Sequence, residues 1–200
     1  MKSEYKSIFE RVDDQFNIAY FCTSYQCEIG NGDRVAVRWI FPDLRVQNIT
    51  FQQFEDASNQ CANMLLALGI SEGDPVFTFL PRSPELFYFS LGILKIKAIA
   101  GILFSNFGEE ALLDRLGDSR ARILLTTKGF LRKVKAIWND LPALQKVIVV
   151  DLDEHESEAI LSFRALMKDA SDEFDIPKTE PETPSVIHYT SGSTGKPKGV

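Results

Sequence analysis

The last twelve residues of the chain have the composition of a phosphate-binding loop. Three glycines, Gly192, Gly195 and Gly199, allow the backbone to turn tightly and to point amide groups inward. Lys196 and Lys198 add positive charge, and four hydroxyl groups add donors that complement the oxygens of a polyphosphate. The hydroxyl groups belong to Thr190, Ser191, Ser193 and Thr194. Composition alone leaves one alternative open, which is a flexible polar tail.

The spacing of this segment differs from that of a Walker loop. A Walker loop has four residues between its first glycine and Gly-Lys, followed by Ser or Thr for magnesium. Here only two residues separate Gly192 from Gly195, and Pro197 follows Lys196. Proline has no hydroxyl group, so we exclude an ordinary P-loop NTPase.

The full string from Tyr189 to Val200 resembles the phosphate loop of the adenylate-forming superfamily, which includes acyl-CoA synthetases, peptide-synthetase adenylation domains and firefly luciferase. Upstream residues extend the resemblance over most of the chain. Leu103–Phe107 with Asp114–Leu116 and Asp118–Ser119 is most similar to the acetyl-CoA synthetase branch, especially its shorter bacterial form.

The resemblance implies a ligase that joins a carboxylate to AMP from ATP and releases pyrophosphate. The thiol of CoA then displaces AMP, and acetate is the acid implied. ATP, CoA and Mg²⁺ bound to ATP are the implied cofactors, and medium-chain or aromatic acids are the alternative substrates. By the same resemblance, the β- and γ-phosphates of ATP would be held by Thr190, Ser191, Gly192, Ser193, Thr194, Gly195 and Lys196.

Three further residues align with CoA contacts of acetyl-CoA synthetases. They are Phe104, Arg132 and Lys135, although Ser105 and Asn106 stand where the family has glycines, and Lys135 where it has arginine. The alternative is that Phe104 lies in the core and that the basic residues, Lys133 included, form a solvated helix face.

We expect no catalytic residue in this chain. Forming an acyl-adenylate needs no protein nucleophile, and the family's adenine, ribose and acyl sites, its hinge and its adenylating lysine would follow Val200. The chain is therefore expected to be an inactive fragment of the large N-terminal domain. The acidic run 151–158 matches no metal-binding loop. A non-catalytic nucleotide-binding or interaction module is the rival from another class.

Composition limits the other classes of function. With 44% hydrophobic and 25% charged residues, the chain of 200 residues can form a globular core. Its net charge of −6 argues against nucleic acid as a partner. Leu86–Phe104 is apolar enough to span a membrane, but Lys95 and Lys97 near its centre favour a buried helix and strand. We expect reduced, buried thiols at Cys22, Cys27 and Cys61, and a cytoplasmic protein.

The elements that position the loop are predicted to form an α/β fold with a mostly parallel sheet flanked by helices, because short apolar strands alternate with helices. We divide the chain into an N-terminal helical segment (1–33), an α/β core (34–150), an acidic irregular connection (151–184), and a strand with the phosphate loop (185–200). A small additional strand pair is expected near 34–50. Strands are predicted at 35–41, 76–80, 99–103, 123–126, 147–150 and 185–190, and helices at 50–68, 83–98, 109–116, 130–138 and 162–169.

Overall fold

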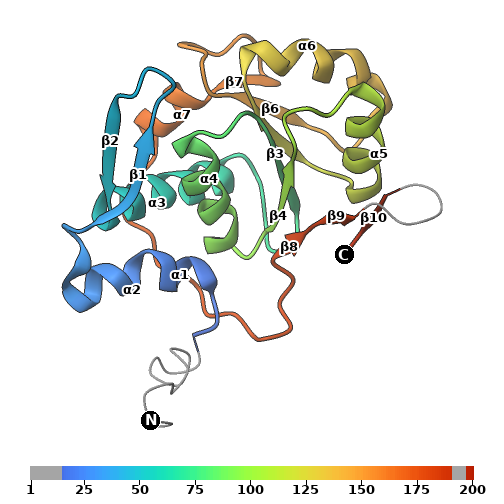
Figure 1. The fold of residues 1–200 in the computed structure, drawn as a ribbon. Coiled ribbons are helices and arrows are strands. Elements are labelled where there is room, and N and C mark those ends of the chain that lie inside the picture. Colours follow the sequence, from blue (N-terminus) through green and yellow to red (C-terminus); the bar gives the residue numbers. More distant parts are fainter. Residues whose placement is uncertain (1–14, 191–196) are drawn as a thin grey trace.

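The centre of the molecule is a parallel β-sheet. The computed structural model describes residues 15–190 and 197–200. Six strands pair in the order β7-β6-β5-β3-β4-β8, and all five pairings are parallel, which confirms the predicted α/β fold (Figure 1). Their bounds are β3 Pro75–Phe79, β4 Ile99–Leu103, β5 Ile123–Thr126, β6 Lys146–Val149, β7 Ile160–Ser162 and β8 Val186–Ile187.

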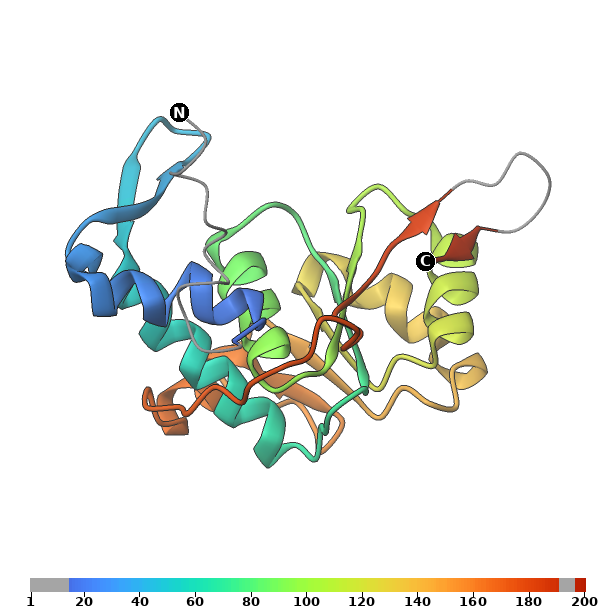
Figure 2. The same cartoon turned by 90° about the horizontal axis from the view of Figure 1, so that it is seen from below.

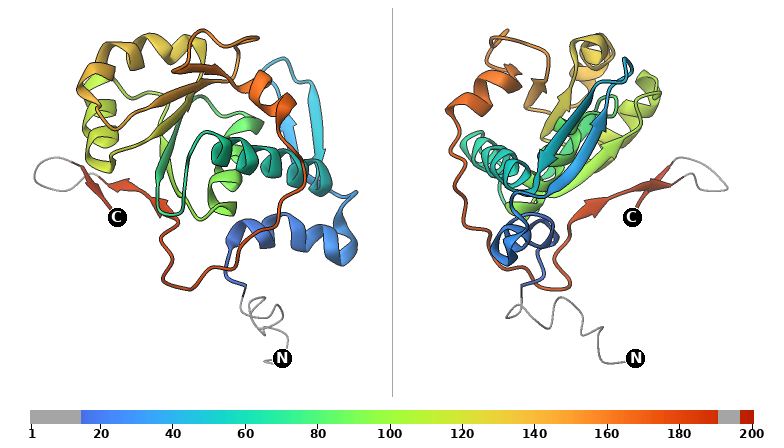
Figure 3. Two further views of the ribbon diagram at one scale, coloured as in Figure 1. Left: turned by 180° about the vertical axis from the view of Figure 1, so that it is seen from behind. Right: turned by 60° about the vertical axis from the view of Figure 1, so that its left-hand side comes forward.

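Helices cover both faces of this sheet (Figures 2 and 3). On one face, α3, α4 and α7 enclose an apolar cluster around Ile93 and Leu125. On the other face, α5 and α6 enclose a second cluster around Leu116 and Leu124. The helix bounds are α3 Phe51–Ala67, α4 Pro84–Lys95, α5 Glu109–Ser119, α6 Lys128–Ile137 with the 3₁₀ turn η3 Trp138–Asp140, and α7 Phe163–Asp169.

The central strands are apolar because both of their faces are covered. All four residues of β5 are buried. In β4, Gly101 leaves room for the ring of Phe77 on β3, since a Cβ atom at residue 101 would lie 2.1 Å from Phe77 Cε1. A larger residue at position 101 would force the Phe77 ring or the strands to shift.

The first long helix, α3, begins as the sequence predicts. Thr50 Oγ1 accepts a hydrogen bond from Gln53 N at 3.2 Å, and Gln53 Oε1 accepts one from Thr50 N at 3.0 Å. This reciprocal capping box satisfies two amide groups at the start of the helix. After the helix, Gly69 adopts φ +83°, as expected of a glycine at a helix C-terminus.

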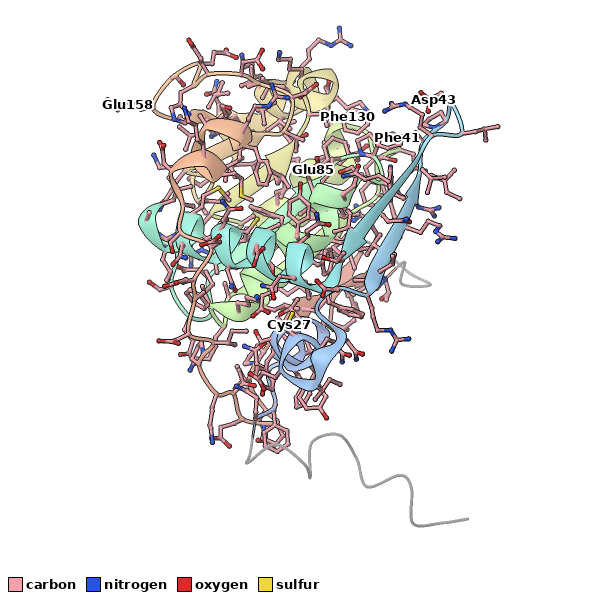
Figure 4. The ribbon with its side chains drawn as sticks, turned by 90° about the vertical axis from the view of Figure 1, so that its left-hand side faces the viewer. Cys27, Phe41, Asp43, Glu85, Phe130 and Glu158 are labelled. Atoms are coloured by element: carbon pink, nitrogen blue, oxygen red, sulfur yellow. The ribbon has the colours of Figure 1, made fainter. Side chains whose placement is uncertain are left out.

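The N-terminal part forms two small units. Short helical turns come first, and residues 1–14 of the expected helical segment lie outside the described residues. The predicted strand pair follows as an antiparallel hairpin. Its tip, with Phe41 and Asp43, points away from the helical turns, where Cys27 lies (Figure 4). The bounds are α1 Ile18–Cys22, α2 Ser24–Gln26, η2 Cys27–Asn31, β1 Val35–Ile40 and β2 Val46–Thr50.

Several elements differ from the sequence prediction, and α5 extends to Ser119, three residues beyond its predicted end. Helix α4 ends at Lys95, not near residue 98, because the chain turns through Lys97 with φ +59°. Strand β7 lies where only an irregular connection and a helix were expected. The strand expected at 185–190 divides at His188 into β8 and β9 (Tyr189–Thr190), and β9 pairs with β10 (Lys198–Gly199) outside the main sheet.

The prediction of three buried thiols is wrong for two of them. Cys61 is buried between α3 and α4, whereas Cys22 is exposed and Cys27 is half-buried. Cys22 is the last residue of α1 and Cys27 the first of η2. Within residues 15–190 and 197–200, no helix is both long and apolar enough to cross a membrane.

Candidate functional site

The order of the strands creates a place for ligands at one edge of the sheet. The chain goes from β3 through α4 to β4, and then returns through α5 to β5 on the other side of β3. The loops that follow β3 and β4 therefore leave for opposite faces of the sheet. Open α/β sheets bind ligands at such a switch point, outside the carboxyl ends of the strands.

The phosphate loop begins beside this sheet, in a narrow hairpin. We define the phosphate-loop hairpin by its described residues, 189–190 and 197–200. At its base, Thr190 pairs with Lys198 and Tyr189 with Gly199. The next pair is closed by two backbone hydrogen bonds, His188 N to Val200 O (2.9 Å) and Val200 N to His188 O (3.0 Å). Thr190 is exposed, and the other predicted phosphate ligands, Ser191–Lys196, lie outside the described residues.

Helix α5 holds the base of this hairpin (Figures 1 and 2). The Tyr189 hydroxyl lies 2.7 Å from Asp118 Oδ2 and 3.1 Å from the backbone oxygen of Arg115. Burial and the hydrogen bond to Asp118 raise the pKa of Tyr189, and the protonated hydroxyl group donates to the carboxylate. Gly199 on β10 allows the Tyr189 ring on β9 to lie close to its backbone, because a Cβ atom at residue 199 would lie 3.2 Å from Tyr189 Cζ.

The turn after β4 is next to the same helix. Phe107 stacks with Arg115, whose guanidinium carbon lies 4.3 Å from the centre of the ring. Phe104 meets Phe107 edge to face at 5.4 Å, but its own side chain is 58% exposed. The alternative that Phe104 belongs to the core is therefore wrong.

The basic residues of α6 differ in their surroundings. Arg132 and Lys135 are exposed, and Lys135 forms an ion pair of 2.6 Å with Glu156. Lys133 is half-buried: its ammonium group donates to the Phe107 carbonyl at 2.9 Å and lies 5.4 Å from the centre of the Phe130 ring. The alternative of a solvated basic face thus agrees with the exposure of Arg132 and Lys135 and is wrong for Lys133.

The two histidines of the chain, which could act in acid–base chemistry, take part in hydrogen bonds that hold the fold. His155 is exposed, and its Nδ1 accepts a hydrogen bond from Ser162 N at 3.0 Å. His188 is exposed between β8 and β9, and its backbone pairs with Val200. In the part of the chain that the structure describes, no group of three histidine, cysteine, aspartate or glutamate side chains could hold a metal ion.

Sequence reasoning assigned no role to three residues that the structure brings together, Phe107, Arg115 and Asp118. Each lies in a run that resembles acetyl-CoA synthetases, and this was the only signal for them. Residue types alone do not show that Tyr189 meets Asp118 and Arg115, which are 71 and 74 positions away.

Comparison with known proteins places these features in one family. Residues 26–200 match the family described as AMP-binding enzyme. An acetyl-coenzyme A synthetase of Bacillus subtilis is 38% identical over 93% of this chain and 32% of its own length. One of Mycolicibacterium smegmatis is 32% identical over 94% of this chain and 22% of its own length. The chain thus spans a third or less of these two relatives.

Solved structures share the fold. An acyl-CoA synthetase of Brucella canis superimposes with a TM-score of 0.82 at 32% identity, over 94% of this chain and 33% of that one. The anthranilate CoA ligase AuaEII, solved with anthranoyl-AMP, also gives a TM-score of 0.82, at 26% identity, over 96% and 35% of the two chains. Together with the family match over residues 26–200, these likenesses show that the chain belongs to the AMP-binding enzymes.

Proposed function

We propose that the full-length protein carrying this chain is an ATP-dependent acyl-CoA synthetase whose acid substrate is acetate. The observation that carries the proposal is the string from Tyr189 to Val200, whose two ends pair as β9 and β10 beside α5. Relatives from bacteria and archaea that match over more than nine-tenths of the chain are named acetyl-coenzyme A synthetase, which supports acetate as the acid.

The proposed reaction has two steps. A carboxylate oxygen attacks the α-phosphorus of ATP and pyrophosphate leaves; the thiol sulfur of CoA then attacks the acyl carbon and AMP leaves. In the first step Thr190 and residues 191–196 would hold the β- and γ-phosphates. Their amide, hydroxyl and ammonium groups would position the triphosphate and neutralise its charge, without covalent chemistry. Mg²⁺ would enter bound to the triphosphate.

The CoA nucleotide would meet Phe104, Arg132 and Lys135 in the second step. Phe104 follows β4 with its ring exposed, and both basic residues are exposed on α6. An exposed ring can stack on an adenine base, and an exposed cation can pair with a phosphate. To pair with such a phosphate, the Lys135 ammonium group would leave its ion pair with Glu156.

An aromatic acid is the second candidate substrate. The likeness to an anthranilate CoA ligase favours it, with a TM-score of 0.82 over 96% of this chain. The described residues do not discriminate between the two acids, so the choice of acetate rests on the names of the relatives.

The test is the product analysis of the purified full-length protein with ATP, Mg²⁺, CoA and one acid at a time, from acetate and propionate to hexanoate and benzoate. We expect AMP and the CoA thioester to form together, with the highest kcat/KM for acetate. Release of ADP, or AMP formation that needs no acid, would overturn the reaction. A preference for benzoate or hexanoate would overturn only the choice of acetate. Residues 1–200 alone are expected to form no thioester.

A further inference from the structure

The phosphate-loop hairpin needs an anchor outside itself. Its strands β9 and β10 are two residues long each, and a hairpin of this length has little stability of its own. Where it faces α5, an open pocket of about 330 Å³ is lined by Pro197 of the hairpin and by Leu113, Asp114, Gly117 and Asp118 of the helix. The direction of the hairpin therefore depends on a few specific contacts.

Tyr189 makes the most specific of these contacts. Its hydroxyl group has one proton and two acceptors on α5, Asp118 Oδ2 at 2.7 Å and the Arg115 backbone oxygen at 3.1 Å. The carboxylate is the nearer and the stronger acceptor. Because Thr190 follows directly, the position of Tyr189 sets where the phosphate loop leaves β9.

Arg115 extends this anchor to the turn after β4. Its guanidinium carbon lies 4.3 Å from the centre of the Phe107 ring and 5.8 Å from that of Tyr189. One nitrogen, Nη1, donates to the Ala111 backbone oxygen at 2.8 Å. Another, Nε, is buried without a hydrogen-bond partner among the described residues. Packing of the two rings thus contributes to fixing the guanidinium group.

We propose that Tyr189 and Asp118 are positioning residues that fix the phosphate-loop hairpin on α5 for ATP binding. This inference rests on the proposed function, because the hairpin must hold ATP for its direction to matter. The two residues touch no substrate: they act through Thr190 and the residues that follow it. Their loss is therefore expected to weaken the use of ATP and to leave the acid site unchanged.

The test uses Tyr189→Phe in the full-length protein, measured by acid-dependent exchange of pyrophosphate into ATP. Phenylalanine keeps the ring that packs on Arg115 and removes only the hydroxyl group. We expect the KM for ATP to rise about tenfold, as for the loss of a hydrogen bond to a charged group. The KM for the acid is expected to stay within about twofold. Asp118→Asn, which keeps an acceptor but removes the charge, is expected to give a smaller rise.

A matched control exists in the N-terminal helices. The Tyr20 hydroxyl donates to Glu28 Oε2 at 2.6 Å, so Tyr20→Phe removes a similar bond far from the hairpin in the sequence. We expect Tyr20→Phe to leave the KM for ATP unchanged. In a double-mutant cycle, Tyr189→Phe and Asp118→Asn together are expected to cost less than the product of their separate effects, because they break the same bond.

The outcomes separate the two proposals. If the unchanged protein shows no acid-dependent exchange, the proposed function fails, and this inference fails with it. If the unchanged protein is active and Tyr189→Phe leaves the KM for ATP as it was, only this inference fails. Equal rises in the KM for ATP and for the acid, or the same effect from Tyr20→Phe, would also overturn it, because they would indicate general damage to the fold.

Discussion

Lys95 Nζ donates a hydrogen bond of 2.6 Å to Asn59 Oδ1, and both side chains are buried where α4 packs on α3. Asn59 Nδ2 donates in turn to the Asp172 backbone oxygen at 2.7 Å. Burial lowers the pKa of Lys95 from 10.5 to about 8, although the nearby carboxylate of Glu55 opposes this change. One amide side chain thus holds a buried ammonium group and connects α3 to the segment that follows α7.

The first prediction concerns the pH dependence of stability. Between about pH 8 and 10.5 the unfolded chain keeps the proton on Lys95 and the folded chain has lost it, so the contribution of Lys95 to stability rises with pH in this window. A pKa unit corresponds to about 1.4 kcal/mol, so the gain is on the order of 3 kcal/mol. Tyrosines and cysteines whose pKa values are raised in the fold lower stability in part of the same window, but they are present in the unchanged protein and in Lys95→Met alike. We therefore expect denaturant unfolding of the full-length protein to show the gain as a difference between the unchanged protein and Lys95→Met that grows with pH.

Lys97→Met is the control for this prediction. The Lys97 ammonium group pairs with Glu72 at 2.7 Å, and its side chain is 23% exposed. We expect this variant to keep the pH dependence of the unchanged protein. Parallel curves for the unchanged protein and Lys95→Met would contradict the lowered pKa of Lys95.

The second prediction concerns the contact of β3 with β4. In Gly101→Ala the new methyl group would lie 2.1–2.4 Å from three atoms of the Phe77 ring. We expect a loss of about 1–3 kcal/mol in the free energy of unfolding, the usual cost of overpacking a core. Gly117→Ala on α5 is the control, because its nearest contact would be Leu141 Cδ2 at 3.8 Å. Equal changes in the free energy of unfolding from the two substitutions would show that β3 and β4 accommodate a methyl group at residue 101 without cost.

The third prediction concerns the loop lysine. Lys196→Ala in the full-length protein is expected to raise the KM for ATP by about tenfold or more, since it removes a charged donor to a phosphate. The KM for the acid is expected to change little. Lys168→Ala, which removes an exposed lysine on α7, is the control. An unchanged KM and kcat for ATP in Lys196→Ala would contradict a phosphate contact.

The fourth prediction separates the CoA contacts from those of ATP. Arg132→Ala and Lys135→Ala are each expected to raise the KM for CoA by about fivefold, the effect of about 1 kcal/mol for an exposed ion pair. Pyrophosphate exchange, which needs no CoA, is expected to stay normal. Glu156→Gln breaks the ion pair but keeps Lys135, so it should not raise the KM for CoA. An unchanged KM for CoA in both alanine variants would show that neither Arg132 nor Lys135 contacts CoA.

Much of the fold is predictable because its signals are local. The capping box of Thr50 and Gln53 and the glycine that follows α3 mark the helix in the sequence itself. Strand β5 was predicted with its observed bounds, 123–126, because a run of buried apolar residues is flanked by polar ones. In each case the deciding residues are neighbours along the chain.

The errors occur where the deciding contact is distant or the signal is short. Helix α4 ends early because Lys97 adopts a left-handed conformation, and the apolar residues around it give no sign of this. Strand β7 has three residues and is recognisable only by its pairing with β6. The contact of Tyr189 with Asp118 joins positions 71 residues apart. The roles of ATP, CoA and acetate, the cytoplasmic location and the absence of a nucleic-acid partner stay predictions.

The most direct test of the central claim is the exchange of labelled pyrophosphate into ATP by the purified full-length protein, with acetate and Mg²⁺ and without CoA. The account predicts label in ATP only when acetate is present, and less label in Lys196→Ala when the ATP concentration is below the KM. Exchange that is absent with every carboxylic acid tested, or that proceeds equally without any acid, would contradict adenylate formation.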